Sequence, residues 1–210
     1  MKYIFLIITS LFISYPVLGQ EKESADKEPK RFEYYFNSGF GYYFPLNNND
    51  FFGDRGASYS FNIQVNYKSN FFIQGYFDMS IINYKKDKIV VNGVVSSLDY
   101  KLNANNIGLD FGYTLPIKSF SPYAYIGAGV TFMDTPFIKS GTDSGEIIFG
   151  TKTKCFPQFN AAIGVDYEIT RYFVLFGEIQ YSSTFLKTSL DNQRLHGVSL
   201  LLGFKTPLWY

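Results

Sequence analysis

Strict alternation of apolar and polar side chains constrains this chain more than any other feature. Between Ser58 and Lys68, the odd positions are aromatic or β-branched, whereas the even positions are Ser, Asn, Gln or Lys. The stretch from Gln158 to Glu168 repeats the pattern. Successive side chains of a β-strand point to opposite faces of its sheet. A period of two therefore predicts strands with one apolar face and one more polar face.

Eight segments of this kind can be marked along the chain. They cover residues 32–44, 58–68, 71–81, 107–113, 124–132, 158–168, 173–181 and 198–204. None of their apolar faces carries a charged residue, although 18% of all residues are charged. We expect an all-β fold in which eight antiparallel strands run up and down in a closed barrel.

The size of the apolar side chains predicts which way they face. Aromatic residues make up 20% of the chain, and the interior of an eight-stranded barrel is only just wide enough for side chains to fill. Small and polar residues suit that interior, so the apolar faces should point outward into lipid, in a transmembrane barrel. A charge there would cost about 2–4 kcal/mol near the bilayer midplane. The residues predicted to face lipid include Phe61, Ile63, Val65, Ile163, Val165, Leu200 and Leu202. A soluble lipocalin-like barrel is the alternative fold.

The connections between the marked segments alternate between short and long. Links at 69–70, 115–121 and 169–171 are short, whereas those at 45–57, 85–106 at most, 134–155 and 183–193 are longer. Outer-membrane barrels have short periplasmic turns and long outer loops, so both ends of the barrel sequence should lie on the periplasmic side. Asn92-Gly93 stands between β-branched runs and predicts a hairpin tip, with strands that extend beyond the membrane.

The first 19 residues have the features of a secretory signal peptide. Lys2 is their only charge, residues 3–13 are mostly apolar, and cleavage is expected near Gly19 and Gln20. The apolar stretch is shorter than the roughly 20 residues that a spanning helix needs. Residues 20–31 are rich in mixed charges and are expected to form a flexible periplasmic segment. Residues 32–210 then form the barrel.

Composition excludes several kinds of function. A formal net charge of +1 provides no basic surface for nucleic acid. One Cys and one His exclude a disulfide framework and a Cys/His zinc cluster, and we find no cofactor site. Cys155 is expected to be a free thiol where a loop meets a strand. Gly127-Ala128-Gly129 is interpreted as close barrel packing, because no Lys-Ser/Thr of a nucleotide loop follows.

Acidic and amide side chains gather on the inward faces. Asp78, Asp110, Asp166, Glu178 and Gln180 are expected to form a polar network in the lumen. Few inward basic residues match these acids, with Lys68 and Arg194 at strand ends. Buried carboxylates need partners, water or protonation. A closed hydrogen-bond network is one interpretation. A narrow path for small solutes or cations is the other.

The barrel pattern, the strand 122–129 and the aromatic C-terminus resemble the small outer-membrane β-barrel families, OmpA-like and OmpX-like. The resemblance covers residues 32–210 and implies a place in outer-membrane lipid. It also implies that the barrel-insertion machinery reads the C-terminal strand. Here Pro207 and the pair Trp209-Tyr210 differ from the lone terminal Phe of that signal.

The leading functional hypothesis is non-enzymatic: a structural or surface-interaction barrel whose outer loops meet an extracellular partner. Loop aromatics such as Phe51, Phe52 and Phe137 could make that contact. A porin-like channel is the first alternative, and a lipid A-modifying enzyme is the second. Lipid A deacylases of this barrel class place His and Ser two residues apart on one strand face, whereas Ser199 falls on the opposite face from His196.

Overall fold

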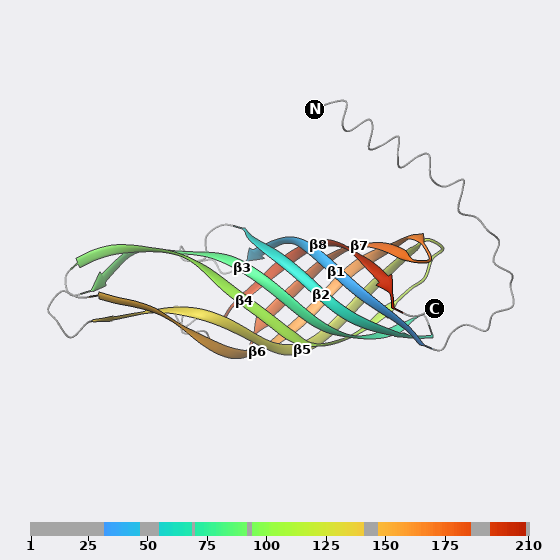
Figure 1. Ribbon diagram of the computed structural model, residues 1–210, viewed down its shortest axis with the longest axis horizontal. Helices are drawn as coiled ribbons and strands as arrows, with labels where there is room; N and C mark the ends of the chain where they lie inside the picture. Colours follow the sequence, from blue (N-terminus) through green and yellow to red (C-terminus); the bar gives the residue numbers. More distant parts are fainter. Residues whose placement is uncertain are drawn as a thin grey trace, which may run out of the picture. The chain divides into compact units, whose positions relative to one another are not determined.

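Eight antiparallel strands pair in chain order and close into a barrel in the computed structural model (Figure 1). The strands are β1 Phe32–Pro45, β2 Gly56–Tyr67, β3 Phe71–Val91, β4 Val94–Thr114, β5 Phe120–Ser140, β6 Ile147–Thr170, β7 Phe173–Thr184 and β8 His196–Pro207. The structure describes residues 32–46, 55–68, 70–91, 94–140, 147–185 and 194–208. The predicted fold class, an eight-stranded up-and-down barrel, is confirmed.

The register of the strands keeps one face apolar around the whole barrel. Across the closing seam, Phe40 on β1 lies opposite Tyr59 on β2 and opposite Leu202 on β8. The same parity continues on β3 and β4, where Phe77 pairs with Ile107. A slip of one residue would move all apolar side chains of a strand to the other face. The alternating sequence therefore determines this register.

Turns at one end of the barrel are short. β2 and β3 are joined through residues 68–70, where Lys68 adopts a φ of 50°, in the left-handed region that non-glycine residues seldom occupy. Lys118, with a φ of 56°, turns the chain between β4 and β5. Residues 171–172 connect β6 to β7. Outer-membrane barrels have their short turns on the periplasmic side, so we expect this end there and call it the periplasmic end.

Four strands are much longer than the other four. β3, β4 and β5 have 21 residues each and β6 has 24, whereas β2, β7 and β8 have 12. The β3–β4 pairing continues to Val91 and Val94, which confirms the predicted extension of that hairpin. The predicted loop at 134–155 is wrong for most of its length, because β5 and β6 pair as far as Ser140 and Ile147. Figure 1 shows both hairpins extending past the other strands at one end.

Several predictions concern residues outside the described part of the chain. These are the signal peptide and the segment 20–31, the hairpin tip Asn92-Gly93, the loop residues Phe51 and Phe52, and the terminal pair Trp209-Tyr210. In the part that is described, no helix is both long and apolar enough to cross a membrane.

Candidate functional site: the filled lumen and the apolar outer face

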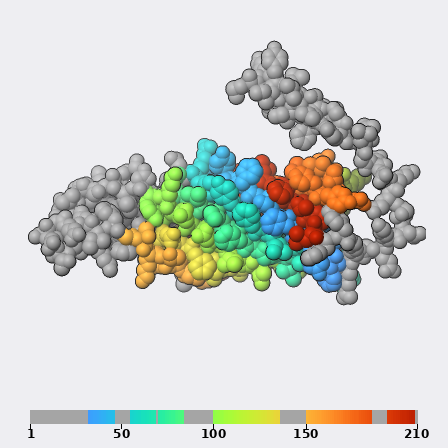
Figure 2. All heavy atoms as spheres, in the orientation of Figure 1, coloured from blue at the N-terminus to red at the C-terminus, as the bar shows by residue number. Residues whose placement is uncertain are grey.

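Large apolar side chains cover the outer face of the strands. Figure 2 shows the part of this face that β1–β4 form. Of the residues predicted to face lipid, Val65 is half-exposed and the others are exposed, from 41% for Phe61 to 65% for Leu202. A soluble barrel would bury this set, so the exposed apolar band favours the membrane alternative.

An aromatic belt surrounds the end with the short turns. Its rings make contacts between neighbouring strands at centroid distances of 4.8 to 6.0 Å: Phe32–Tyr67, Phe71–Tyr113, Phe71–Phe111, Phe120–Tyr167 and Phe173–Phe204. Aromatic belts of this kind mark the boundary between hydrocarbon and the polar headgroups in membrane barrels. The belt therefore fixes one edge of the apolar band.

Two of the predicted lumen acids accept hydrogen bonds from strands that are not their neighbours. Gln180 on β7 donates from Nε2 to Oδ2 of Asp78 on β3, at 2.8 Å. Glu178, also on β7, accepts from the hydroxyls of Tyr123 and Tyr125 on β5, at 2.8 and 2.7 Å. In a barrel of eight strands β3 and β7 lie on opposite sides. The side chains of Gln180 and Asp78 therefore meet across the full width of the lumen.

Asp110 is the centre of a second group. Its carboxylate accepts from Gln74 Nε2 at 2.9 Å and from Asn160 Nδ2 at 3.3 Å. Asp110 is 1% exposed. A side chain at Gly127, on the neighbouring strand, would collide with the Asp110 carboxylate. Gly127 therefore makes room for the buried acid. This explains one of the two glycines of Gly127-Ala128-Gly129, which the sequence analysis interpreted as a site of close barrel packing.

The sequence analysis missed a lumen cation, Lys205. Its Nζ lies 2.9 Å from Asp166 Oδ2 and 3.3 Å from Gln64 Oε1, and 4.2 Å above the ring of Tyr123. Among the buried residues that the structure describes, Lys205 is the only cation. It lies two residues before the end of β8 at Pro207 and adds to the few inward basic residues that were expected near strand ends. Lys205 follows Phe204, which faces outward, so strand alternation places Lys205 inward. This alternation was the signal in the sequence that could have revealed it.

The outer end of the lumen is apolar, which the sequence analysis also missed. One buried cluster there consists of Tyr43, Ile82, Leu102, Ala104, Met133, Phe156 and Leu195. Next to this outer cluster is a hollow of only about 10 Å³, bordered by polar residues such as Thr131 and Gln158. That is roughly the space for one water molecule. Side chains therefore fill the lumen at this level.

A wider cavity opens at the periplasmic end. It measures about 320 Å³ and is lined by charged residues that include Glu33, Glu168 and Arg171. Its inner wall holds the Lys205–Asp166 ion pair. The cavity therefore reaches the polar network of the lumen at this ion pair.

The remaining candidate residues do not come together in a reactive group. His196 is half-buried at the start of β8, whereas Ser199 points inward and lies 3.2 Å from the Ser58 hydroxyl. Cys155 is a free, exposed thiol within β6 rather than at a loop junction. Phe137, predicted in a loop, lies in β5. Within the described ranges, no three His, Cys, Asp or Glu side chains are grouped to hold a metal ion.

The closed barrel and its exposed apolar band define the class of integral membrane barrels. A family model for the outer membrane protein beta-barrel domain matches residues 22–205. The chain belongs to this family, and its place is the outer membrane. No curated protein is similar enough in sequence to count as a match.

Solved structures of similar fold include a major outer membrane protein from Thermus thermophilus, with a TM-score of 0.55 and 12% identity. That match covers 84% of this chain and 99% of the other. Neisserial surface protein A has a TM-score of 0.51 and 12% identity, over 86% of this chain and 99% of its own. At these identities the likeness is one of fold.

Proposed function

We propose that this protein is a non-enzymatic, non-conducting barrel that acts at the cell surface through its two projecting hairpins. The filled lumen is the observation that carries this proposal. Gln180 and Asp78 join facing strands at 2.8 Å, and the outer cluster occupies the lumen above them. A solute path would have to break this network and displace buried apolar side chains such as Leu102 and Met133.

The hairpins supply the surface for interaction. A transmembrane β-strand needs about 9–11 residues, so 21 residues in β3 leave roughly ten, or about 30 Å along the strand, beyond the bilayer. Pairing of β3 with β2 reaches Ser80, and pairing of β4 with β5 reaches Ala104. Beyond these points, the described β3–β4 ladder continues by itself and leaves backbone groups available along its edges. Such edges readily pair with another chain.

Export and assembly are part of the same proposal. Residues 1–19 would direct secretion and be removed near Gly19, and residues 20–31 would remain as a periplasmic segment. The barrel-insertion machinery would bind the C-terminal strand, β8, whose outward side chains Leu200, Leu202 and Phe204 alternate with inward ones. Outer-membrane lipid would surround residues such as Ile63 and Val165.

Conductance in planar bilayers tests the closed lumen. We expect no discrete current steps from the refolded wild-type barrel, with refolding checked by heat-modifiable migration on a gel. The control is the pair of substitutions Leu102→Gly and Met133→Gly, which removes two members of the outer cluster and should introduce steps if the assay can detect an opened barrel. Steps from the wild type, at a size similar to those of the control, would contradict the non-conducting role.

A deletion strain tests the surface role and the enzymatic alternative together. It is complemented either with the full chain or with a variant in which residues 85–99 are replaced by Asn-Gly. We expect the trimmed variant to behave like the deletion in adhesion assays, while lipid A masses are identical in all strains. Normal adhesion with the trimmed variant would contradict a role for the β3–β4 hairpin. A lipid A mass that depends on the protein, and on His196, would favour the enzyme.

A further inference from the structure

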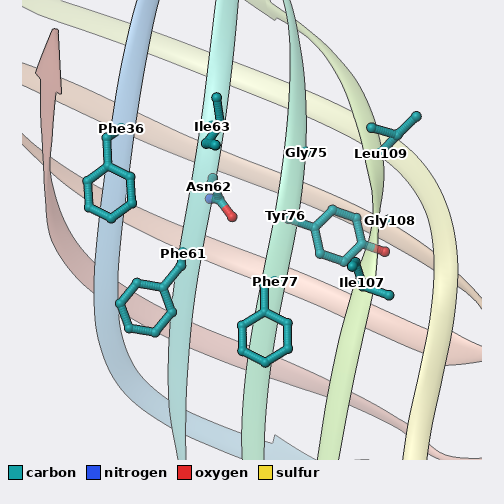
Figure 3. A pocket seen from close by; sticks show the side chains of 10 residues that line it. All are labelled: Phe36, Phe61, Asn62, Ile63, Gly75, Tyr76, Phe77, Ile107, Gly108 and Leu109. Carbon is teal, nitrogen blue, oxygen red and sulfur yellow. The ribbon is translucent and has the colours of Figure 1, made fainter. Parts of the chain in front are cut away.

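A hollow of about 660 Å³ lies on the outer face of the barrel, across β1 to β4. The outward side chains that line it are Phe36, Phe61, Ile63, Phe77, Ile107 and Leu109. Figure 3 shows them around the position of Gly75, from which no side chain projects. Asn62 and Tyr76 also border the hollow but are buried on the lumen side. We call this hollow the Gly75 groove.

The strand register places Gly75 at the centre of an apolar row. Ile63 on β2 and Leu109 on β4 are its direct neighbours, and they are 57% and 65% exposed. The adjacent row, Phe61, Phe77 and Ile107, has a large side chain on each strand. The groove therefore forms where Gly75 has no side chain, within an otherwise continuous apolar surface.

The fold itself does not require glycine at this position. A Cβ added to Gly75 would have ordinary van der Waals contact with Leu109 Cδ2, at 3.8 Å, and its φ is outside the left-handed region. By contrast, a Cβ at Gly129 would collide with the backbone of β4 and the Tyr76 hydroxyl. Glycine inside a strand weakens it and often marks a close approach by a ligand or another backbone. At Gly75 nothing in the barrel fills the space that the glycine leaves.

We propose that the Gly75 groove binds one acyl chain of a bilayer phospholipid. Every outward side chain that lines it is hydrocarbon, so it offers dispersion contacts and no hydrogen bond or charge to a ligand. It is continuous with the apolar band of a barrel whose family resides in the outer membrane. A chain lying in the groove would contact protein on its floor and both walls, whereas a chain on a convex part of the barrel contacts it on one side.

The depth of the groove indicates which part of the chain it holds. Its lining residues lie four to seven positions from the periplasmic ends of their strands. At about 3.3 Å per residue along tilted strands, this height is near the middle of an apolar band about 25 Å tall. The groove therefore meets the methyl-terminal half of a chain. A second copy fits less well, because a twofold contact would set the hollow against itself.

Photolabelling in phosphatidylethanolamine and phosphatidylglycerol vesicles tests this assignment. A small fraction of the phospholipid carries a diazirine near the methyl end of one chain, and adducts are mapped by peptide mass spectrometry. We expect β3 and β4 to be labelled about tenfold more than the β6–β8 face at the same depth, a preference of about 1.4 kcal/mol. Gly75→Leu fills the groove and should remove the preference.

Gly177→Leu is the matched control, because Gly177 is the equivalent outward glycine between Val165 and Leu202 and does not line the groove. It should leave the amount of label on β3 and β4 unchanged, and heat-modifiable migration verifies that both variants are folded. Equal labelling around the wild-type barrel would overturn the proposal. Weaker labelling at the groove than elsewhere would also overturn it and would indicate a second copy or another protein there. Stronger labelling of the groove by a probe placed near the headgroup would overturn it as well.

Discussion

At the scale of single residues, each buried charge in the lumen depends on a specific partner. Glu178 is 7% exposed and accepts hydrogen bonds from Tyr123 and Tyr125. Glu178→Ala leaves two buried hydroxyls without their acceptor, so we expect the free energy of unfolding to fall by about 2–4 kcal/mol. Urea unfolding in phospholipid vesicles measures it. The exposed Glu168 offers a control, since Glu168→Ala should change stability by no more than about 0.5 kcal/mol. Similar losses in both variants would contradict this role for Glu178.

The ion pair between Lys205 and Asp166 should show strong coupling. Lys205→Met leaves the carboxylate without its ion-pair partner, and we expect a loss of about 3–5 kcal/mol of stability. Adding Asp166→Asn removes the unpaired charge, so the double variant should be at least about 1 kcal/mol more stable than Lys205→Met alone. A double-mutant cycle by urea unfolding measures this coupling. Strictly additive losses would show that the two groups do not depend on each other.

The sequence predicted inward residues well where the alternation is clean. Asp78, Asp110 and Glu178 stand between outward apolar residues, and the structure buries all of them. The outer cluster could not be predicted in this way, because apolar residues occupy both faces near the outer rim. Tyr42-Tyr43-Phe44 shows the difficulty, since Tyr43 is buried while its neighbours face outward. A period of two identifies faces only where the environments on the two sides differ.

At the scale of the elements, strand length was the feature that the sequence predicted least well. The alternation marked on β5 ends at Phe132, and residues 134–155 were predicted to form a loop, yet β5 continues to Ser140. A strand that has left the bilayer no longer needs an apolar face, whereas its backbone pairing with the neighbouring strand can continue. Sequence pattern therefore marks the membrane-embedded part of each strand, and backbone pairing determines the full length.

The projecting part of the β3–β4 hairpin should contribute little to barrel stability. Replacing residues 85–99 with Asn-Gly keeps the pair Tyr84–Tyr100 and all of the outer cluster. We expect its free energy of unfolding in vesicles to be within about 1 kcal/mol of the wild type. The reason is that, in the part of this segment that the structure describes, the strands pair only with each other. Leu102→Ala, within the outer cluster, should instead cost about 2–5 kcal/mol. A large loss on trimming would place the hairpin within the cooperative unit.

At the scale of the whole molecule, the direction of the apolar face determines where the protein can exist, and one strand provides a matched test. Ile163 and Ile169 are both exposed on β6, at 61% and 46%, and Ile169 lies where the pairing of β6 with β7 shifts register. Ile163 lies seven residues from the periplasmic end of the strand, near the middle of the apolar band, whereas Ile169 lies at its edge. Ile163→Arg should therefore lower the free energy of unfolding in vesicles by about 2–4 kcal/mol, and Ile169→Arg by about 0–1 kcal/mol. Equal and small effects would mean that water, not hydrocarbon, surrounds the barrel. Because both substitutions replace an exposed isoleucine of the same strand with arginine, the loss of isoleucine is common to both. The remaining difference reports depth in the bilayer, together with the register shift at Ile169.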